Sequence, residues 1–120
     1  EPIKEALSGC ESITLCEPLA LREFHFLMRR SYMILTDSGG IQEEATFIGR
    51  PTLVLRDTTE RPEGIRAGAL RLVGTERESI LLAARELLYD NDRYSKMSVA
   101  SNIYGDGHAS ERICELLLKI

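Results

Sequence analysis

The stretch YMILTDSGGIQEEATFIGRPTLVL (Tyr32–Leu55) contains a strand, a turn, a helix and a second strand in immediate succession. Its first four residues, Tyr32–Leu35, form a nearly continuous apolar run, which is typical of a strand buried on both faces of a parallel sheet. An apolar stripe at helical spacing follows, formed by Ile41, Ala45 and Ile48. Gly49 ends this helix, and the run Thr52–Leu55 predicts the next strand. This order indicates a parallel sheet with a right-handed crossover.

The same alternation continues on both sides of this stretch. Segment 56–64, RDTTERPEG, is predicted to be a polar loop, and the first residues, EPIKEAL, resemble the end of a helix, so we interpret the chain as a piece of a longer protein. The order predicts an α/β fold whose parallel sheet has helices on both faces. Further strands are expected at Ser12–Cys16 and Leu70–Val73, and further helices at Leu21–Met28, Glu76–Tyr89 and Ala109–Lys119.

Length and composition limit the kind of protein. The 120 residues, 43% of them hydrophobic, are enough for one domain with one core. No segment approaches the ~18 apolar residues that a membrane-spanning helix requires, and we recognise no signal peptide. With a net charge of −4 and scattered arginines, the chain lacks the basic surface of a nucleic-acid-binding protein. We therefore expect a cytoplasmic protein that binds neither membranes nor nucleic acids.

The cysteines and histidines do not form a metal-binding pattern. Cys10, Cys16 and Cys114 fit no zinc spacing, and we expect reduced thiols. His25 and His108 lie far apart, and a packed or surface role is the better interpretation of His25. We expect no metal and no cofactor.

The Ser-Gly-Gly turn is the first candidate site, because ligands of parallel sheets bind at the carboxyl ends of the strands. The helix that follows Leu35 offers free backbone N–H groups at its start, and Gly39 and Gly40 have no side chain that blocks an anion. Ser38 adds a hydroxyl. Phosphate binding and simple helix capping by Asp37 or Ser38 fit this motif about equally well.

The residues that follow favour a nucleotide over a bare phosphate. Glu43 and Glu44 both suit the start of a helix, but an acidic residue one turn beyond a phosphate site is also placed to bind ribose hydroxyls. On the helix, Ile41, Ala45 and Ile48 mark the face toward the sheet, so Glu43 should be more exposed to solvent than Glu44. The loop after the next strand reaches the same edge with Arg56, Thr58, Thr59 and Arg61, and alone it reads as an ordinary solvated loop.

Taken together, the motifs TDSGGIQEEA, LRDTTERPE, LVGT and YGDG resemble the C-terminal part of the non-hydrolysing bacterial UDP-N-acetylglucosamine 2-epimerases. The resemblance runs from about Ser12 to the end of the chain. It implies a Rossmann-like parallel sheet flanked by helices, within a two-domain fold of the glycosyltransferase-B type. Residues 1–120 would be most of the C-terminal nucleotide-binding domain, without its opening strands and without the N-terminal domain.

The resemblance also assigns ligand-binding residues. The Ser-Gly-Gly turn matches the positions that hold the diphosphate, and Glu44 matches the carboxylate that binds the ribose. Phe24 matches an aromatic residue that packs on the uracil, although its spacing fits a core position equally well. Arg61 matches an arginine that reaches the ligand. The full set is Phe24, Ser38, Gly39, Gly40, Glu44 and Arg61.

The reaction implied by the resemblance interconverts UDP-GlcNAc and UDP-ManNAc by elimination and re-addition of UDP, for polysaccharide biosynthesis. The proton-transfer residues of the family lie upstream of this chain, so no catalytic residue is assigned and the chain alone is expected to be inactive. Expected partners are UDP-GlcNAc or UDP, the N-terminal domain and a second subunit in a homodimer of the full-length protein. A nucleotide-sugar binding module without chemistry, a hydrolysing relative and a glycosyltransferase remain as alternatives.

Overall fold

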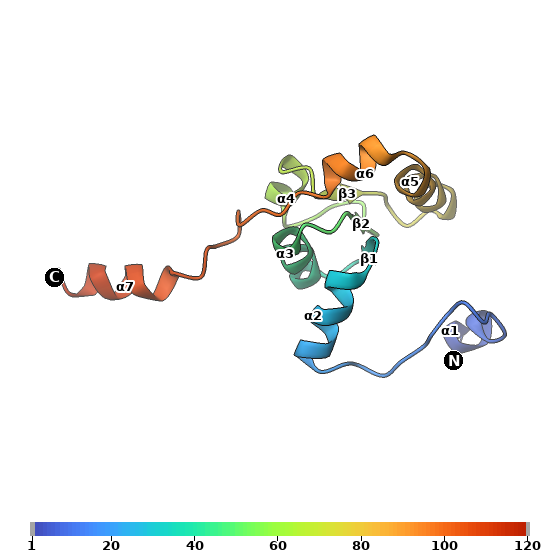
Figure 1. Cartoon of the computed structure of the whole chain (residues 1–120), viewed down its shortest axis with the longest axis horizontal. Coiled ribbons are helices and arrows are strands. Elements are labelled where there is room, and N and C mark those ends of the chain that lie inside the picture. Colours follow the sequence, from blue (N-terminus) through green and yellow to red (C-terminus); the bar gives the residue numbers. More distant parts are fainter. Residues whose placement is uncertain (1, 120) are drawn as a thin grey trace.

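The structure, a computed structural model, describes residues 2–119, without the side chain of Ile3, and its centre is a small parallel sheet (Figure 1). Within these residues the sheet has three strands, β1 (Ile34–Thr36), β2 (Thr52–Val54) and β3 (Leu70–Leu72), in the order β1-β2-β3. Both strand pairs are parallel, with Leu35 opposite Leu53 in the first pair. The predicted parallel α/β fold is therefore confirmed.

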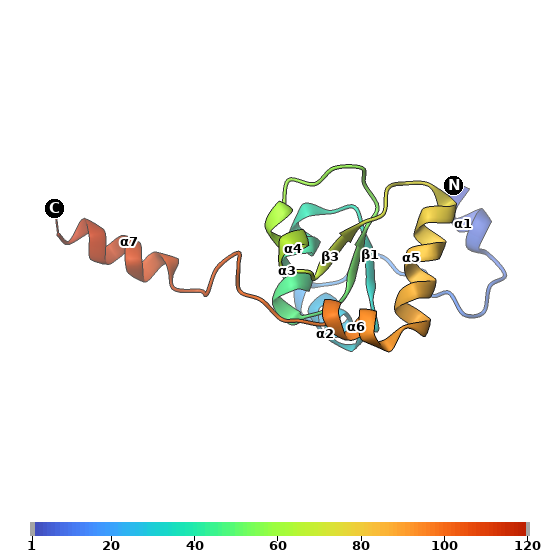
Figure 2. The same ribbon diagram turned by 90° about the horizontal axis from the view of Figure 1, so that it is seen from above.

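Helices cover both faces of this sheet. Figure 2 shows α3 and α4 on one face and α5 on the other, in agreement with the contacts of α3 with β1 and β2, of α4 with β3 and of α5 with β2. The first and last helices project away from the sheet, and the chain is 62 Å long in its longest dimension (Figure 1). The helices are α1 (Pro2–Leu7), α2 (Leu21–Arg30), α3 (Gly39–Ile48), α4 (Pro62–Arg66), α5 (Arg77–Tyr89), α6 (Asn91–Met97) and α7 (Ala109–Leu117).

The core lies on the α5 side of β2. Leu53 of β2 packs with Val73, Ala83 and Leu87, and all four side chains are buried. All three residues of β2 are fully buried because β2 is the central strand with helices on both faces. Among residues 2–119, no helix combines the length and the apolar character needed to cross a membrane.

Two predictions about strands are wrong. Residues 12–16 form no strand and are exposed, because none of the three strands found in the described part of the chain pairs with them. The strand at 32–35 begins two residues later than predicted and is an edge strand, so Leu35 is 44% exposed instead of buried. An apolar run thus predicted a strand correctly but not its place in the sheet.

Two short helices, α4 and α6, were also missed. α4 begins within the predicted polar loop, with Pro62 in its first turn, where proline is well tolerated. α6 follows Asp90, whose carboxylate accepts hydrogen bonds from the N–H groups of Asp92 and Arg93. Neither helix has an apolar stripe that sequence periodicity could detect.

Gly49 ends α3 as predicted, and its conformation gives a test of the fold. Its φ of +70° lies in the left-handed region, and a Cβ there would lie 2.7 Å from the backbone nitrogen of Ala100. Gly68 also lies in the left-handed region, with a φ of +82°. A Cβ there would have the carbonyl oxygen of Lys96 as its nearest neighbour, at 3.9 Å. The two glycines therefore separate backbone strain from steric contact.

We expect Gly68→Ala to lower the free energy of unfolding by about 1–2 kcal/mol, the cost of a left-handed alanine. Gly49→Ala adds a steric clash, which costs about 1–3 kcal/mol more. Urea denaturation of both variants measures the difference. Equal losses in the two variants would contradict the close packing of the segment at Ala100 against the end of α3.

Candidate functional site

The Ser-Gly-Gly turn lies at the carboxyl end of β1 and begins α3. Ser38 is the N-cap residue, yet its side chain makes no capping hydrogen bond, and its N–H donates to the Thr36 hydroxyl at 3.1 Å. A Cβ placed on Gly39 or Gly40 would meet no atom within 4 Å, and neither glycine has a positive φ. The fold itself therefore does not require glycine at these positions, and the start of α3 is open to an anion from outside.

The buried face of α3 differs from the predicted one. Gln42, Ala45 and Thr46 are fully buried, whereas Ile41 and Ile48 are only half-buried. Two of the buried polar groups have partners: the Thr46 hydroxyl donates to the Gln42 carbonyl at 2.8 Å, and the Gln42 side-chain oxygen accepts from Thr59. Ala45 is buried as predicted, but the helix is rotated so that Gln42 and Thr46, not the predicted isoleucines, share its buried face.

This rotation also changes the expected difference between the two glutamates. The Glu43 side chain is 37% exposed and the Glu44 side chain 41%, so the prediction that Glu43 would be more exposed is wrong. Glu44 accepts a hydrogen bond from His25 of α2, with 3.1 Å between Oε2 and Nε2. Glu43 forms an ion pair with the Arg61 guanidinium. Each carboxylate therefore connects α3 to a different neighbouring segment.

The loop after β2 reaches the same edge of the sheet as the Ser-Gly-Gly turn, because β1 and β2 are adjacent and parallel. Arg56 binds Glu60 through two hydrogen bonds of 2.9 and 3.0 Å and lowers the pKa of that carboxyl. Arg61 precedes α4, and its bond to Glu43 raises the pKa of its guanidinium. Both arginines of this loop thus have a carboxylate partner within the chain.

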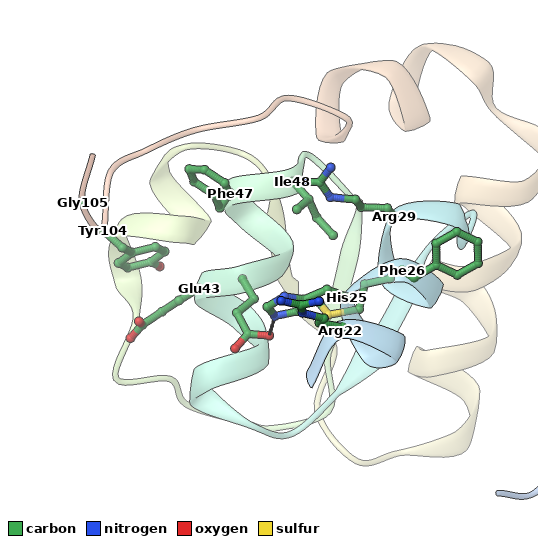
Figure 3. Close-up of a pocket in the computed structure, with 11 residues that line it drawn as sticks. Arg22, His25, Phe26, Arg29, Glu43, Phe47, Ile48, Tyr104 and Gly105 are labelled. Carbon is green, nitrogen blue, oxygen red and sulfur yellow. Dashed lines mark hydrogen bonds and ion pairs between the residues drawn. The ribbon is translucent and has the colours of Figure 1, made fainter. Parts of the chain in front are cut away.

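A cavity of about 560 Å³ lies between α2, α3 and the segment at Tyr104 (Figure 3). Glu43 and Glu44 line it from α3, and His25 lines it from α2. Most of its wall is apolar or aromatic, which suits an organic ligand. The remaining lining residues are Arg22, Phe26, Met28, Arg29, Phe47, Ile48, Tyr104 and Gly105.

Phe24 lies outside this cavity. It lines a smaller hollow of about 270 Å³, together with Thr36 at the end of β1 and Ile41 in the first turn of α3. Its side chain is half-buried, so it is not a core residue of the sheet. Phe24 is therefore near the Ser-Gly-Gly turn, while Glu44 faces the larger cavity.

Tyr104, in the YGDG motif, connects the last segment to the loop of Arg61. Its hydroxyl donates to the carbonyl of Arg61 at 3.5 Å and lies against Gly64, where a Cβ would be 2.6 Å from it. Burial raises the pKa of the Tyr104 hydroxyl. The sequence prediction assigned no role to Tyr104 or to the His25 contact, although the YGDG motif drew attention to the first.

No metal site accompanies these groups in the part of the chain that the structure describes. Residues 2–119 contain no cluster of three or more histidine, cysteine, aspartate or glutamate side chains arranged to hold an ion. All three cysteines are free and exposed.

Comparison with known proteins connects this geometry to one family. A family model described as UDP-N-acetylglucosamine 2-epimerase matches residues 1–118. The enzyme of that name from Bacillus subtilis is 58% identical over 108 residues, which is 90% of this chain and 28% of the relative.

Solved structures of similar proteins share the fold. The chain aligns with a UDP-GlcNAc 2-epimerase from Neisseria meningitidis bound to UDP-GlcNAc, with a TM-score of 0.93 and 48% identity over 99% of this chain and 32% of the other. The MnaA–UDP co-structure from S. aureus gives a TM-score of 0.89 and 51% identity, over 95% and 31% of the two chains. The chain thus spans less than a third of the length of these relatives.

The half-buried side chain of Tyr104 predicts a pH effect on stability. Because its pKa is raised in the folded chain, the hydroxyl ionises more readily in the unfolded chain. The neutral hydroxyl therefore contributes to the free energy of unfolding. This contribution is complete below the ordinary tyrosine pKa of about 10 and is lost as the pH rises through the pKa of Tyr104 in the folded chain. We expect Tyr104→Phe to lose less stability than wild type between pH 8 and pH 11, in urea denaturation. Tyr89→Phe, at a residue that is 84% exposed, is the control for the loss of a tyrosine hydroxyl. If Tyr104→Phe loses stability with pH in the same way as wild type, the raised pKa of Tyr104 is not the cause of the pH effect.

Proposed function

The chain belongs to the UDP-N-acetylglucosamine 2-epimerase family, and we propose that it is the UDP-binding part of an enzyme that interconverts UDP-GlcNAc and UDP-ManNAc. The match of the family model to residues 1–118 carries this proposal. It is supported by the fold shared with the N. meningitidis protein bound to UDP-GlcNAc and with the S. aureus MnaA–UDP co-structure.

The whole enzyme would contain more than this chain. Because the chain spans less than a third of its relatives, the rest of the enzyme would supply a second domain that closes over the nucleotide sugar. Residues 1–120 would then be most of the C-terminal nucleotide-binding domain. We place the enzyme in the cytoplasm, where nucleotide sugars for polysaccharide biosynthesis are made, and the complete protein would be able to form a homodimer.

The start of α3 is the proposed diphosphate site. The backbone N–H groups at Gly39 and Gly40 have no helical partner, the positive end of the helix dipole lies there, and the Ser38 hydroxyl makes no capping bond. The absence of any atom near the two glycines leaves room for phosphate oxygens. Arg61, at the same edge of the sheet, would supply a guanidinium to the same group.

The nucleoside would lie beside this turn. Phe24 shares a hollow with Thr36 and Ile41, which flank the Ser-Gly-Gly turn, and this supports the proposal that its ring packs on the uracil. Glu44 is held by His25 through one oxygen, Oε2, and Oε1 would accept a ribose hydroxyl. In this proposal the uracil would contact α2 and the ribose would contact α3.

These groups suit the chemistry of elimination, in which negative charge develops on the leaving diphosphate. Fixed N–H donors at a helix start stabilise such charge without rearranging during the reaction. They also retain UDP until it adds again to the other face of the sugar. By the family resemblance, the proton transfers at the sugar carbon would belong to residues outside this chain, so we assign no catalytic residue within it.

Product analysis of the intact enzyme tests this function. Incubation with UDP-GlcNAc is expected to give UDP-ManNAc in equilibrium with the substrate, and little free UDP. Unchanged substrate would instead favour a nucleotide-sugar binding module without chemistry. Accumulation of UDP with free ManNAc would favour a hydrolysing relative, and transfer of the sugar to an acceptor would favour a glycosyltransferase.

The ribose contact of Glu44 gives a second test. In the intact enzyme, Glu44→Gln keeps the shape of the side chain but removes a charged acceptor, so UDP affinity should fall by about 1–3 kcal/mol in calorimetry. Glu78→Gln, at an exposed glutamate of α5 on the other face of the sheet, should change it by no more than about 0.5 kcal/mol. Glu43 is unsuitable as this control because it binds Arg61. The ribose assignment is wrong if Glu44→Gln binds UDP as tightly as wild type. It is also wrong if Glu44→Gln loses thermal stability to the same extent as it loses UDP affinity.

A further inference from the structure

The side chain of Gln42 is fully buried in α3, but only one end of its amide is bound. Its Oε1 accepts a hydrogen bond of 2.7 Å from the Thr59 hydroxyl. Its Nε2 has no hydrogen-bond partner among the described residues. A buried amide with a free N–H group is less favourable for folding than an apolar side chain of similar length. Fold stability alone therefore does not explain glutamine at this position.

The Thr59 hydroxyl links Gln42 to the backbone of Arg61. While it donates to Gln42, the same oxygen accepts the N–H of Arg61 at 3.0 Å. A hydroxyl can rotate about its C–O bond, and an acceptor on one side fixes the direction of its proton and of its remaining lone pairs. Gln42 thus fixes the orientation of the Thr59 hydroxyl, and this hydroxyl fixes the main chain where Arg61 precedes α4.

The neighbouring residue of α3 holds the other end of Arg61. Glu43 accepts a hydrogen bond from Nε of the guanidinium, and the Glu60 carbonyl accepts one of 3.3 Å from Nη1. Nη2 makes no hydrogen bond within residues 2–119 and remains available. Two consecutive residues of α3, Gln42 and Glu43, therefore hold Arg61 by its backbone and by its side chain. Since α3 begins at the proposed diphosphate site, Arg61 is positioned relative to that site.

We propose that Gln42 is a positioning residue that sets Arg61, through the Thr59 hydroxyl, for contact with the diphosphate of the ligand. This inference rests on the proposed UDP-binding function. A guanidinium binds phosphate oxygens through a rigid planar fork, so small displacements of its backbone weaken the contact. The amide of Gln42 contributes this alignment, and its unpaired nitrogen is a cost to the fold.

The test measures UDP affinity by calorimetry in the intact enzyme for single and double variants. Arg61→Met should weaken UDP binding by about tenfold or more, the loss expected for a charge-assisted contact. Gln42→Met and Thr59→Val, which keep side-chain size but remove the amide or the hydroxyl, should each weaken it by about three- to tenfold. Thr59→Ser, which keeps the hydroxyl, should bind like wild type.

The double variants separate positioning from a general loss of structure. If Gln42 acts through Arg61, then Gln42→Met should have no further effect on UDP affinity in the Arg61→Met background. Thermal unfolding should show Gln42→Met as stable as wild type or more stable, because the buried unpaired N–H is removed. The inference is overturned if Gln42→Met weakens UDP binding equally with and without Arg61. It is also overturned if Thr59→Val binds UDP like wild type.

Two further outcomes distinguish the inference from the function on which it rests. If wild type binds UDP but Arg61→Met binds it equally well, the UDP site stands and the role of Gln42 is wrong. If wild-type enzyme binds no UDP, both the proposed site and the role of Gln42 are wrong.

Discussion

The parallel pairing of β1 with β2 is the constraint on which the rest of this structure depends. With Leu35 opposite Leu53, the N–H of Leu55 donates to the carbonyl of Thr36 at 2.9 Å, just where both strands end. Parallel pairing brings both carboxyl ends to the same edge, so the Ser-Gly-Gly turn and the loop of Arg61 emerge side by side. Every group of the proposed diphosphate site comes from one of these two segments.

The second constraint is the rotation of α3 about its own axis. Burial of Gln42 and Thr46 depends on polar partners, and the Thr59 hydroxyl supplies one of them from the neighbouring loop. This rotation places Glu43 toward Arg61 and Glu44 toward His25. A helix with isoleucines on its inner face would place neither carboxylate there, because adjacent positions differ by about 100°. The polar contacts under α3 thus decide which acidic side chain faces which neighbour.

Much of this arrangement could be predicted from the sequence, and the failures have physical causes. Strong local signals predicted where β1 and β2 lie along the chain, although β1 begins two residues later than predicted, and the glycine after α3 predicted the end of that helix. The failures required tertiary information. Periodicity favoured Ile41 over Gln42 as the inner residue because the partner of Gln42, Thr59, lies 17 positions away. The segment 12–16 has the composition of a strand, but a strand forms only beside a partner.

The site residues show the same division between local and tertiary information. The open turn at Gly39 and Gly40 follows from residues next to each other in the sequence, and the structure places it at the start of a helix as predicted. The pairing of Arg61 with Glu43 and of Glu44 with His25 joins separate elements, and residue spacing gives no sign of either.

The electrostatics of the proposed site follow from these pairings. Arg56 is bound by Glu60 and Arg61 by Glu43, so the loop brings two positive charges together with two negative ones. The chain as a whole carries a net charge of −4, which on its own does not attract an anion from a distance. In the proposed site, the backbone N–H groups at the start of α3 would supply local attraction for a diphosphate, and among the described residues outside the local helix no atom would lie within 4 Å of a Cβ on either glycine. Arg61 would then contribute direction more than charge, because the carboxylate that offsets its charge also fixes the orientation of its guanidinium.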